Sequence, residues 1–259
     1  MLIGFPQLLD KVNEHIDRLD YAREPMNLYE PVKYILALGG KRIRPVMMLM
    51  AYNMYRDDVD KILDPALALE IYHNFTLLHD DIMDNADVRR GKPTVHKRWD
   101  ANTAILSGDV MLSLADVYMS RIDDAYFRQV MATFHQTSIE IAEGQQYDMD
   151  FETRTDVAEQ EYIEMIRLKT SVLLACALKI GAILGGASED DAAHLYRLGE
   201  CIGLAFQLRD DYLDVYGDPK VFGKKIGGDI LCNKKTYLYI NALRLADKEQ
   251  RAVLDYWAT

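Results

Sequence analysis

Apolar residues recur at helical spacing along most of the chain, in runs separated by short segments of glycine, proline and aspartate. Strand-like alternation of apolar and polar residues is absent from the sequence. Long stretches rich in Ala, Leu, Met, Glu and Lys also favour helix. The pattern therefore predicts an all-α fold. Because no low-complexity linker or shift in composition marks a boundary, we expect residues 1–259 to form a single domain.

Two of the predicted helices end in the same cluster of aspartates. The first follows Asp64-Pro65, runs through ALALEIYHNFTLLHDDIMD and is expected to stop near Asn85, ahead of a polar, basic loop, ADVRRGKPTVH. The second is LGECIGLAFQLRDDYLDVYGD, which Gly217 and Pro219 end in the usual helix-stop order. Each DDxxD cluster thus lies near a helix C-terminus, where the partial negative charge of the helix favours a nearby cation.

The outer aspartates of each cluster lie four residues apart, so on a helix their side chains point the same way. These pairs are Asp80 with Asp84 and Asp210 with Asp214, while Asp81 and Asp211 lie on the flanks. Like charges at this spacing repel by roughly a few tenths of a kcal/mol on an exposed helix. A pattern that costs stability twice indicates a compensating cation. Oxygen ligands without His or Cys suit Mg²⁺, which substrate phosphates can complete.

Two other interpretations of these clusters deserve comparison. A single DDxxD is more often a solvated acidic helix end, but a second copy behind another apolar helix disfavours that interpretation. Glu70 and His73 form a Glu-x-x-His pair of the kind that di-iron bundles use. Such a site needs the pair twice, and we find no second one.

Composition and charge narrow the class of protein. The chain is 49% hydrophobic and 27% charged, which is typical of an ordinary globular protein, and its formal net charge is -11. This balance argues against a general nucleic-acid binder, which needs clustered positive charge. The three cysteines, Cys176, Cys201 and Cys232, are scattered and lack CxxC spacing, so the sequence suggests neither a disulfide framework nor a zinc site. A reducing, cytoplasmic setting fits this pattern.

No membrane or secretion signal is expected. The segment MLIGFPQLLDKV lacks the basic region and apolar core of a signal peptide. The most apolar run, SVLLACALKIGAILGGA at residues 171 to 187, is short, holds Lys179 and ends in Gly185 and Gly186. We therefore expect a fully buried helix there rather than a membrane span.

Any anionic ligand must be held by local basic groups, and four stretches supply them. GGKRIRP, residues 39 to 45, places Lys41, Arg42 and Arg44 beside a predicted helix start, where free backbone N–H groups also attract anions. RRGKP follows the first aspartate cluster, and Lys169-Thr170 borders the apolar run. FGKKIGGDILCNKKT supplies Lys224, Lys225, Lys234 and Lys235. Single basic groups usually snorkel or cap, but their occurrence together with two DDxxD clusters favours a site for metal and phosphate.

These motifs resemble, in kind and in order, those of the trans-isoprenyl diphosphate synthases, also called polyprenyl synthetases. The stretches GGKRIRP, DDIMD with RRGKP, KT, FQLRDDYLD and GKKIGGD with a downstream KKT span residues 39 to 236. The resemblance, to the short-chain geranylgeranyl or farnesyl type, implies helices around a deep central cavity and a homodimer. It implies a prenyltransferase that condenses an allylic diphosphate (dimethylallyl, geranyl or farnesyl) with isopentenyl diphosphate, head to tail, and releases pyrophosphate.

The resemblance also implies roles for individual residues. Three Mg²⁺ ions would bridge Asp80, Asp84 and Asp210 to the allylic diphosphate, while Asp81, Asp211 and Asp214 would act in supporting or water-mediated roles. The residues that would contact the allylic diphosphate are Arg89, Lys169, Thr170, Gln207, Lys234 and either Lys224 or Lys225. Those that would bind isopentenyl diphosphate are Lys41, Arg44, His73 and Arg90, with Gly40 in the same glycine-rich loop.

Product length in the family depends on the residues four, five and eight positions before the first aspartate, here Thr76, Phe75 and Tyr72. Tyr72 and Phe75 lie three residues apart, so their rings should stack along one side of the helix and form a floor. Aromatic residues at this spacing are also ordinary core residues, and the two interpretations are compatible. The resemblance implies all-trans products of C15 to C20.

The sequence departs from the family's pattern in two respects, and two rival functions share part of that pattern. The chain ends at DYWAT, earlier than full-length relatives, so either it is shortened or the C-terminal closure is absent, and the family's basic C-terminal tail is not visible. A class I terpene cyclase shares the fold and one DDxxD, but the second DDxxD and GGKRIRP argue for chain elongation. A non-catalytic subunit of a heteromeric prenyl synthase tends to lose aspartates, and all six are present here.

Overall fold

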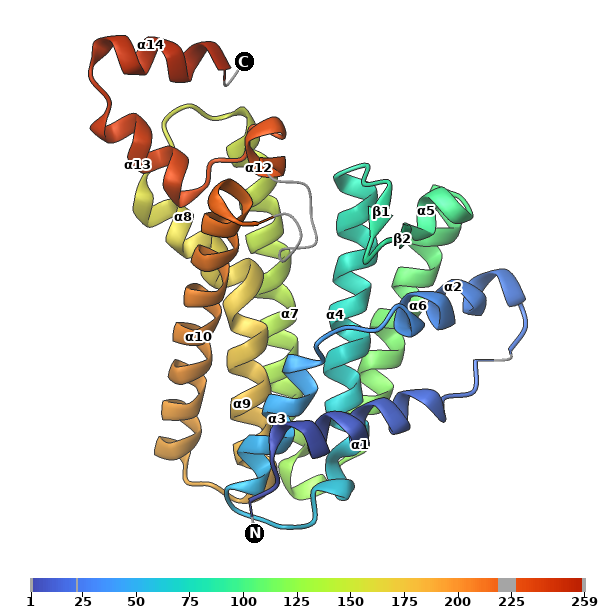
Figure 1. Ribbon diagram of the computed structural model, residues 1–259. Coiled ribbons are helices and arrows are strands. Elements are labelled where there is room, and N and C mark those ends of the chain that lie inside the picture. The colour runs from blue at the N-terminus through green and yellow to red at the C-terminus, as the bar shows by residue number, and fades with distance from the viewer. Residues whose placement is uncertain (1, 22, 219–226, 258–259) are drawn as a thin grey trace. The chain divides into compact units, whose positions relative to one another are not determined.

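The computed structural model describes residues 2–21, 23–218 and 227–257, and within these ranges the chain is almost entirely helical (Figure 1). The all-α prediction is therefore confirmed. Lys224 and Lys225, between which the sequence left the choice of ligand open, lie outside the described residues, as does Pro219.

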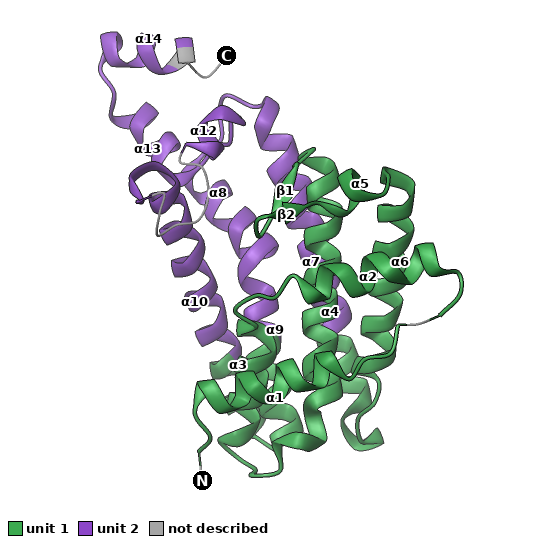
Figure 2. Ribbon diagram, turned by 45° about the vertical axis from the view of Figure 1, so that its right-hand side comes forward, with its two compact units in different colours: residues 1–133, 177–195 green, residues 134–176, 196–259 purple. Residues whose placement is uncertain are grey.

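The chain divides into two compact units, each assembled from two stretches that are distant in sequence (Figure 2). Unit 1 contains residues 1–133 and 177–195, and unit 2 contains residues 134–176 and 196–259. The division falls within three long helices: α7 (Asp124–Thr153), α9 (Val172–Gly185) and α10 (Glu189–Tyr216). That residues 1–259 form a single domain remains a prediction.

Unit 1 is built around α4 (Leu63–Met83), which packs most extensively against α6 (Ala101–Met119). Its side chains Leu69 and Ile71 are completely buried. The remaining elements here are α1 (Phe5–Asp17), α2 (Met26–Ala37), α3 (Ile43–Asn53), the 3₁₀ turn η1 (Val59–Ile62), β1 (Val88–Arg89), β2 (Lys92–Pro93) and α5 (Val95–Arg98). A central apolar helix thus carries the first aspartate cluster at its end.

The ends of α4 agree with the sequence at one terminus and differ at the other. The helix begins at Leu63, two residues before Pro65, so the expected start after Asp64-Pro65 is wrong. A proline in the first turn still loses no hydrogen bond, because the N–H groups there have no partner within the helix. The predicted stop near Asn85 is confirmed, since Asp84 is the C-cap and Asn85 has φ 49°.

The basic segment after α4, expected to be a loop, forms a small antiparallel hairpin. Val88 pairs with Pro93 and Arg89 with Lys92. The two turn residues, Arg90 and Gly91, have φ values of 52° and 74°, as a two-residue hairpin turn requires. The expectation of no strands is therefore wrong at this point. Its strands are too short to show an alternation of apolar and polar residues in the sequence. The hairpin reverses the chain, so that Arg89 lies against Asp81 of α4.

Unit 2 contains parts of α7, α9 and α10, together with α8 (Glu159–Ile166), the π-helical turn η2 (Arg167–Ser171), α12 (Gly228–Leu231), α13 (Tyr237–Leu245) and α14 (Lys248–Trp257). Its small core gathers Phe151, Tyr162, Met165, Ile166 and Ile240. As predicted, the second aspartate helix ends just before Gly217, at Tyr216.

Glycines allow close approach of backbones in unit 2. A Cβ at Gly203 of α10 would lie 2.4 Å from Ser171 Cα, and one at Gly144 of α7 would lie 2.3 Å from the backbone nitrogen of Lys169. Real side chains do not tolerate such distances. α7 is therefore held against η2 at Lys169 and α10 is held against it at Ser171, on either side of Thr170.

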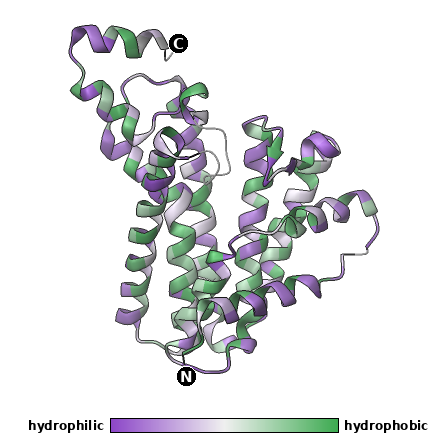
Figure 3. Cartoon of the chain, viewed as in Figure 1, coloured by the Kyte–Doolittle hydropathy of each residue, from purple (hydrophilic) through white to green (hydrophobic). Residues whose placement is uncertain are grey.

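The apolar run of the sequence forms α9, whose apolar character is visible along the helix in Figure 3. The continuous helical stretch Glu159–Gly185 is long and apolar enough to pass a composition test for a membrane span, but its most apolar part is largely buried inside the protein. This agrees with the expected buried helix.

Candidate active site

The first aspartate motif separates into one anchored and two more accessible carboxylates. The Asp81 side chain is only 3% exposed and accepts hydrogen bonds from Arg89, whose Nε lies 2.9 Å from Oδ1 and 2.8 Å from Oδ2. Burial raises the pKa of Asp81, and Arg89 opposes this effect. Asp80 is partly exposed and Asp84 is exposed. Asp81 is thus tied inward, and the outer two carboxylates remain reachable by a cation.

Arg89, which the resemblance assigns to the allylic diphosphate, lies against this motif. Its Nη2 is 2.8 Å from Asp81 Oδ1 and 3.7 Å from Asp80 Oδ2. The β1–β2 hairpin produces this contact, because it reverses the chain immediately after α4. One guanidinium therefore both compensates the charge of Asp81 and borders Asp80.

The GGKRIRP segment is organised around a buried ion pair. Arg42 is the N-cap of α3, with φ 47°, and its Nη1 donates to Glu70 Oε1 at 2.6 Å. Its Nη2 donates to the carbonyl of Leu36 at 2.7 Å. Asn74 Nδ2 also donates to Glu70 Oε1, at 2.9 Å. These contacts occupy Glu70 in the protein interior, which argues against the di-iron interpretation of the Glu70 and His73 pair.

Arg44, His73 and Arg90 come together in unit 1. The Nε atom of Arg44 is buried and has no hydrogen-bond partner among the described residues. Burial is the main cause that lowers the pKa of Arg44 to about 10. Burial, followed by the nearby charges of Arg44 and Arg90, holds the pKa of His73 well below its usual value. His73 is therefore neutral at physiological pH, while the surrounding arginines leave the site strongly positive.

Arg90 also explains the requirement for glycine in the preceding loop. It donates a hydrogen bond to the carbonyl of Gly39, and a Cβ at Gly40 would lie 3.0 Å from Arg90 Nη2. Gly40 has φ 148°, a conformation that side chains disfavour. Lys41 follows with an exposed side chain. Of the residues assigned to isopentenyl diphosphate, the structure thus places Gly40, Arg44, His73 and Arg90 close together.

The residues expected to limit product length form an aromatic stack on α4. The rings of Tyr72 and Phe75 are 5.4 Å apart, edge to face, as the spacing predicted. Phe75 also contacts His79, with ring centroids 4.8 Å apart. His79 was not singled out by the sequence; it fits because Gly108 of α6, where a Cβ would lie 2.2 Å from His79 Nε2, leaves room. Thr76 donates its hydroxyl hydrogen to the carbonyl of His73 at 2.8 Å.

The second aspartate motif also anchors its middle carboxylate, but through neutral partners. The phenol of Tyr162 donates to Asp211 Oδ2, and Gln207 Nε2 donates to Asp211 Oδ1 at 3.0 Å. Burial raises the pKa of Asp211 and the two hydrogen bonds oppose this effect. Thr170 donates in turn to Gln207 Oε1 at 3.1 Å. Asp210 is partly exposed.

The last aspartate of this motif, Asp214, is buried with 7% of its surface exposed. Its Oδ2 accepts a hydrogen bond from the backbone N–H of Asp229 at 3.1 Å, and its carbonyl accepts one from Gly227 at 2.7 Å. Asp214 therefore fixes the start of α12 rather than standing open.

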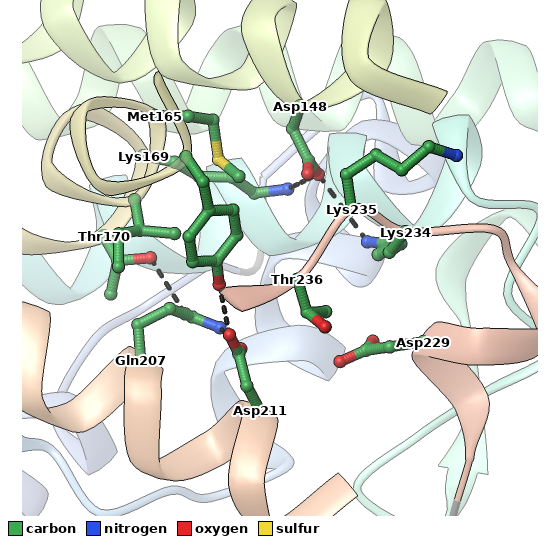
Figure 4. Close-up of a pocket in the computed structure, with 12 residues that line it drawn as sticks. Asp148, Met165, Lys169, Thr170, Gln207, Asp211, Asp229, Lys234, Lys235 and Thr236 are labelled. Carbon is green, nitrogen blue, oxygen red and sulfur yellow. Dashed lines mark hydrogen bonds and ion pairs between the residues drawn. The ribbon is translucent and has the colours of Figure 1, made fainter. Parts of the chain in front are cut away.

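A pocket in unit 2 collects most of the polar residues that the sequence assigned to this half (Figure 4). Those it was expected to contain are Lys169, Thr170, Gln207, Asp211 and Lys234. Those that were missed are Asp148, Tyr162, Met165 and Ile166. Lys235 was named among the basic groups of its stretch, and Asp229 and Thr236 lie in the motifs GKKIGGD and KKT, but none of the three had been assigned a role of its own. No repeated motif or spacing singles out Asp148 or Tyr162 in the sequence, since their partners lie 21 and 49 residues away.

Asp148 is the centre of the charged side of this pocket. Lys169 Nζ lies 2.6 Å from Asp148 Oδ2, and Lys234 Nζ lies 3.6 Å from the same oxygen. Burial would raise the pKa of Asp148, but the two lysines hold it below its usual value. The carboxylate is therefore ionised and shared between two ammonium groups.

The donor chemistry of the three more accessible aspartates fits a hard divalent cation. Asp80, Asp84 and Asp210 offer only carboxylate oxygens, and none of the three is fully buried. Within the described residues, no three His, Cys, Asp or Glu side chains gather as a closed metal centre does. Mg²⁺ needs no such closed centre, because it keeps several waters and takes one or two carboxylates together with substrate phosphates.

The chain is similar to known proteins over most of its length. Residues 25–258 match the polyprenyl synthetase family. The chain is 45% identical over 233 residues to a geranylgeranyl diphosphate synthase of Methanosarcina mazei, covering 89% of this chain and 72% of that protein. It is 41% identical over 245 residues to a short chain isoprenyl diphosphate synthase of Methanocaldococcus jannaschii, covering 94% and 74%.

Solved structures give the same result. A crystal structure of a geranylgeranyl pyrophosphate synthase superposes with a TM-score of 0.94 at 49% identity, covering 99% of this chain and 78% of that chain. The geranylgeranyl pyrophosphate synthetase of Pyrococcus horikoshii superposes with a TM-score of 0.92 at 36% identity, covering 98% of this chain and 80% of that chain.

The chain belongs to the polyprenyl synthetase family. It is accordingly a prenyltransferase of the short-chain prenyl diphosphate synthase type and depends on a divalent metal.

Proposed function

We propose that this prenyltransferase extends a dimethylallyl, geranyl or farnesyl diphosphate with isopentenyl diphosphate, head to tail, to all-trans products of C15 to C20. The proposal rests above all on the two DDxxD motifs, each of which keeps a partly exposed first aspartate while its middle aspartate is anchored. Relatives that are named geranylgeranyl diphosphate synthases support the upper end of this range.

Asp80, Asp84 and Asp210 would hold Mg²⁺, three ions in each active site. Bound Mg²⁺ supplies positive charge that stabilises the departing pyrophosphate. A similar protein, the polyprenyl synthase of Caulobacter crescentus, has been crystallised with calcium and isoprenyl diphosphate; it is 26% identical, with a TM-score of 0.80, over 100% of this chain and 85% of that chain. Asp81, Asp211 and Asp214 act as supports, which agrees with their burial.

The allylic diphosphate is assigned to basic and polar groups in each unit. Lys169, Thr170, Gln207 and Lys234 line the pocket of unit 2, and Arg89 borders Asp80. Fixed ammonium and guanidinium groups stabilise negative charge as it develops on the leaving group. A dry, apolar cavity would then keep water away from the allylic cation until the double bond of isopentenyl diphosphate reaches it.

Isopentenyl diphosphate is assigned to Lys41, Arg44, His73 and Arg90. Two observations support this assignment. The buried Nε atom of Arg44 has no hydrogen-bond partner among the described residues, and the pKa of His73 is held well below its usual value. A neutral imidazole can donate a hydrogen bond to a phosphate without adding charge. Pyrophosphate, once released, serves as the base that removes the proton from the condensation product.

We further propose a homodimer in the cytoplasm, because the family usually forms one and the three scattered cysteines suit a reducing compartment. Sedimentation of the purified protein would distinguish dimer from monomer.

The central test is turnover with defined substrates. The protein is incubated with Mg²⁺, isopentenyl diphosphate and each of the three primers, and products are separated by chain length. The proposal expects linear C15 to C20 diphosphates and stoichiometric pyrophosphate. Cyclic hydrocarbon formed without isopentenyl diphosphate would instead indicate a terpene cyclase. No condensation with any primer would favour a non-catalytic subunit.

A further inference from the structure

Two lysines from distant parts of the sequence converge on one carboxylate oxygen in unit 2. Lys169 comes from the π-helical turn η2, and Lys234 comes from the segment after α12. Their Nζ atoms lie 2.6 and 3.6 Å from Oδ2 of Asp148, as the dashed lines of Figure 4 mark. The Asp148 side chain is 14% exposed, so this meeting point is largely shielded from water.

The backbone is arranged so that Asp148 can reach both lysines. Asp148 lies one helical turn beyond Gly144 on α7, where the lack of a side chain allows the backbone of Lys169 to approach. The turn η2 departs from regular α-helix at this position. Single π-turns of this kind are frequent at functional sites. The fold thus fixes the carboxylate, and the carboxylate in turn fixes the two flexible lysine side chains.

The charges make Asp148 unsuitable as a ligand for an anion but suitable as an anchor. Two ammonium groups that gather without a counter-ion repel each other, and this repulsion is strong in a partly buried pocket. One carboxylate offsets that repulsion and still leaves a net positive charge. A diphosphate would therefore meet two cations that are already held together.

We propose that Asp148 is a positioning residue for the pyrophosphate leaving group, because it gathers Lys169 and Lys234 into one binding site for it. This inference rests on the proposed function, in which both lysines bind the allylic diphosphate. Asp148 does not itself touch the substrate.

The test is Asp148→Asn, which keeps the shape of the side chain and removes its charge. The matched control is Asp150→Asn on the same helix, because Asp150 is exposed and its side chain accepts a hydrogen bond only from Gln146 among the contacts described, at 2.7 Å. The measurements are the inhibition constant of inorganic pyrophosphate, the KM for the allylic primer and the KM for isopentenyl diphosphate.

The sign of the effect separates positioning from simple electrostatics. Removing a negative charge from a basic pocket would by itself strengthen pyrophosphate binding. Loss of positioning instead weakens it, and we expect the inhibition constant and the primer KM to rise roughly tenfold, with the isopentenyl KM within about twofold of wild type. Asp150→Asn should change none of them. Equal or tighter pyrophosphate binding by Asp148→Asn would overturn the inference.

Two further arms keep the test decisive. If Asp148→Asn does not fold, Asp148→Glu keeps the charge but displaces the oxygen by one methylene; weaker pyrophosphate binding at an unchanged melting temperature is expected, and unchanged binding refutes positioning. In a Lys234→Met background, Asp148→Asn should have a smaller effect, because the residues act together. Wild-type protein that turns over no primer would contradict the proposed function itself. If the wild type turns over normally and Asp148→Asn has the wild-type inhibition constant for pyrophosphate, only this inference is contradicted.

Discussion

The two DDxxD motifs are identical in pattern, yet the structure gives their aspartates different surroundings. In both, the middle residue is buried, but Asp81 pairs with a guanidinium, whereas Asp211 is held by a phenol and an amide. The last residue also differs, since Asp84 is an exposed helix cap and Asp214 is buried against the start of α12. Only the first aspartate has a similar, partly exposed environment in both motifs.

The comparison shows that aspartates at corresponding positions of a repeated motif can have different roles. Asp81 is compensated by a full charge, so its partner contributes electrostatic stability. Asp211 is satisfied by hydrogen bonds from neutral groups, so its partners mainly fix geometry. The carboxylates that can act on a ligand are therefore fewer than the sequence suggests, and each motif should respond differently when its partner is removed.

The largest expected effect tests what the motifs share. Asp80→Asn and Asp210→Asn should each lower turnover by roughly a hundredfold to a thousandfold, because each removes a charge that would hold Mg²⁺ against the leaving group. The melting temperature should change little, since neither change creates a cavity or an unpaired buried charge. Steady-state kinetics and thermal unfolding measure both quantities. Normal turnover in both variants would contradict the metal assignment.

The next effect should appear in the first motif only. Arg89→Met removes the partner of the buried Asp81 carboxylate and should lower the free energy of unfolding by about 3 kcal/mol. Urea unfolding gives this value. Combining Arg89→Met with Asp81→Asn should recover much of the loss, because no buried charge then remains. Failure of the second substitution to recover stability would mean that Arg89 stabilises the fold through other contacts.

In the second motif the corresponding change is milder. Tyr162→Phe removes one hydrogen bond to Asp211, and the free energy of unfolding should fall by about 1 kcal/mol, since Gln207 still donates to the same carboxylate. The measurement is again urea unfolding. A loss as large as that of Arg89→Met would show that the two middle aspartates depend equally on their partners.

Product length should depend on the helix before the first motif and not on the helix before the second. Phe75→Ala, alone or with Tyr72→Ala, should lengthen the products by at least one five-carbon unit, because it opens the aromatic stack. Phe206 lies four residues before Asp210 and is 38% exposed, so Phe206→Ala serves as the control and should leave product length unchanged. Chromatography of the dephosphorylated products measures their chain length. Unchanged length after both α4 substitutions would refute the floor.

The smallest expected effect concerns pH. Burial and the nearby Arg44, Arg90, Arg89 and Arg42 lower the pKa of His73 in the folded protein, so the neutral form persists below the unfolded value of about 6.5. The neutral His73 side chain therefore contributes to the free energy of unfolding above the unfolded pKa, and this contribution is lost as the pH falls through the pKa of the folded protein. Between pH 6.5 and 8.5, His73→Gln should therefore leave the shape of the pH–rate profile unchanged. Disappearance of an ionisation in that range would show that His73 titrates during turnover.

The sequence predicted local features well and long-range ones poorly. Helix ends near Asn85 and Gly217 follow from residues next to them, and the stacking of Tyr72 on Phe75 follows from helical spacing. The hairpin after α4 was missed because its strands are two residues long. Tyr162, a partner of Asp211, and Asp148, the partner of Lys169, were missed because these contacts depend on which helices pack together, and that information is spread over the whole core.

The π-helical turn Arg167–Ser171 also constrains how this protein can be redesigned. A π-turn holds one more residue than an α-turn closing the same loop, so deleting one residue there would restore regular helix. Every side chain on one side of the deletion would then rotate by about 100° relative to the other side. Lys169 and Thr170 could no longer both reach their present partners. A single substitution in this turn changes one side chain, whereas a change of its length displaces all of them together.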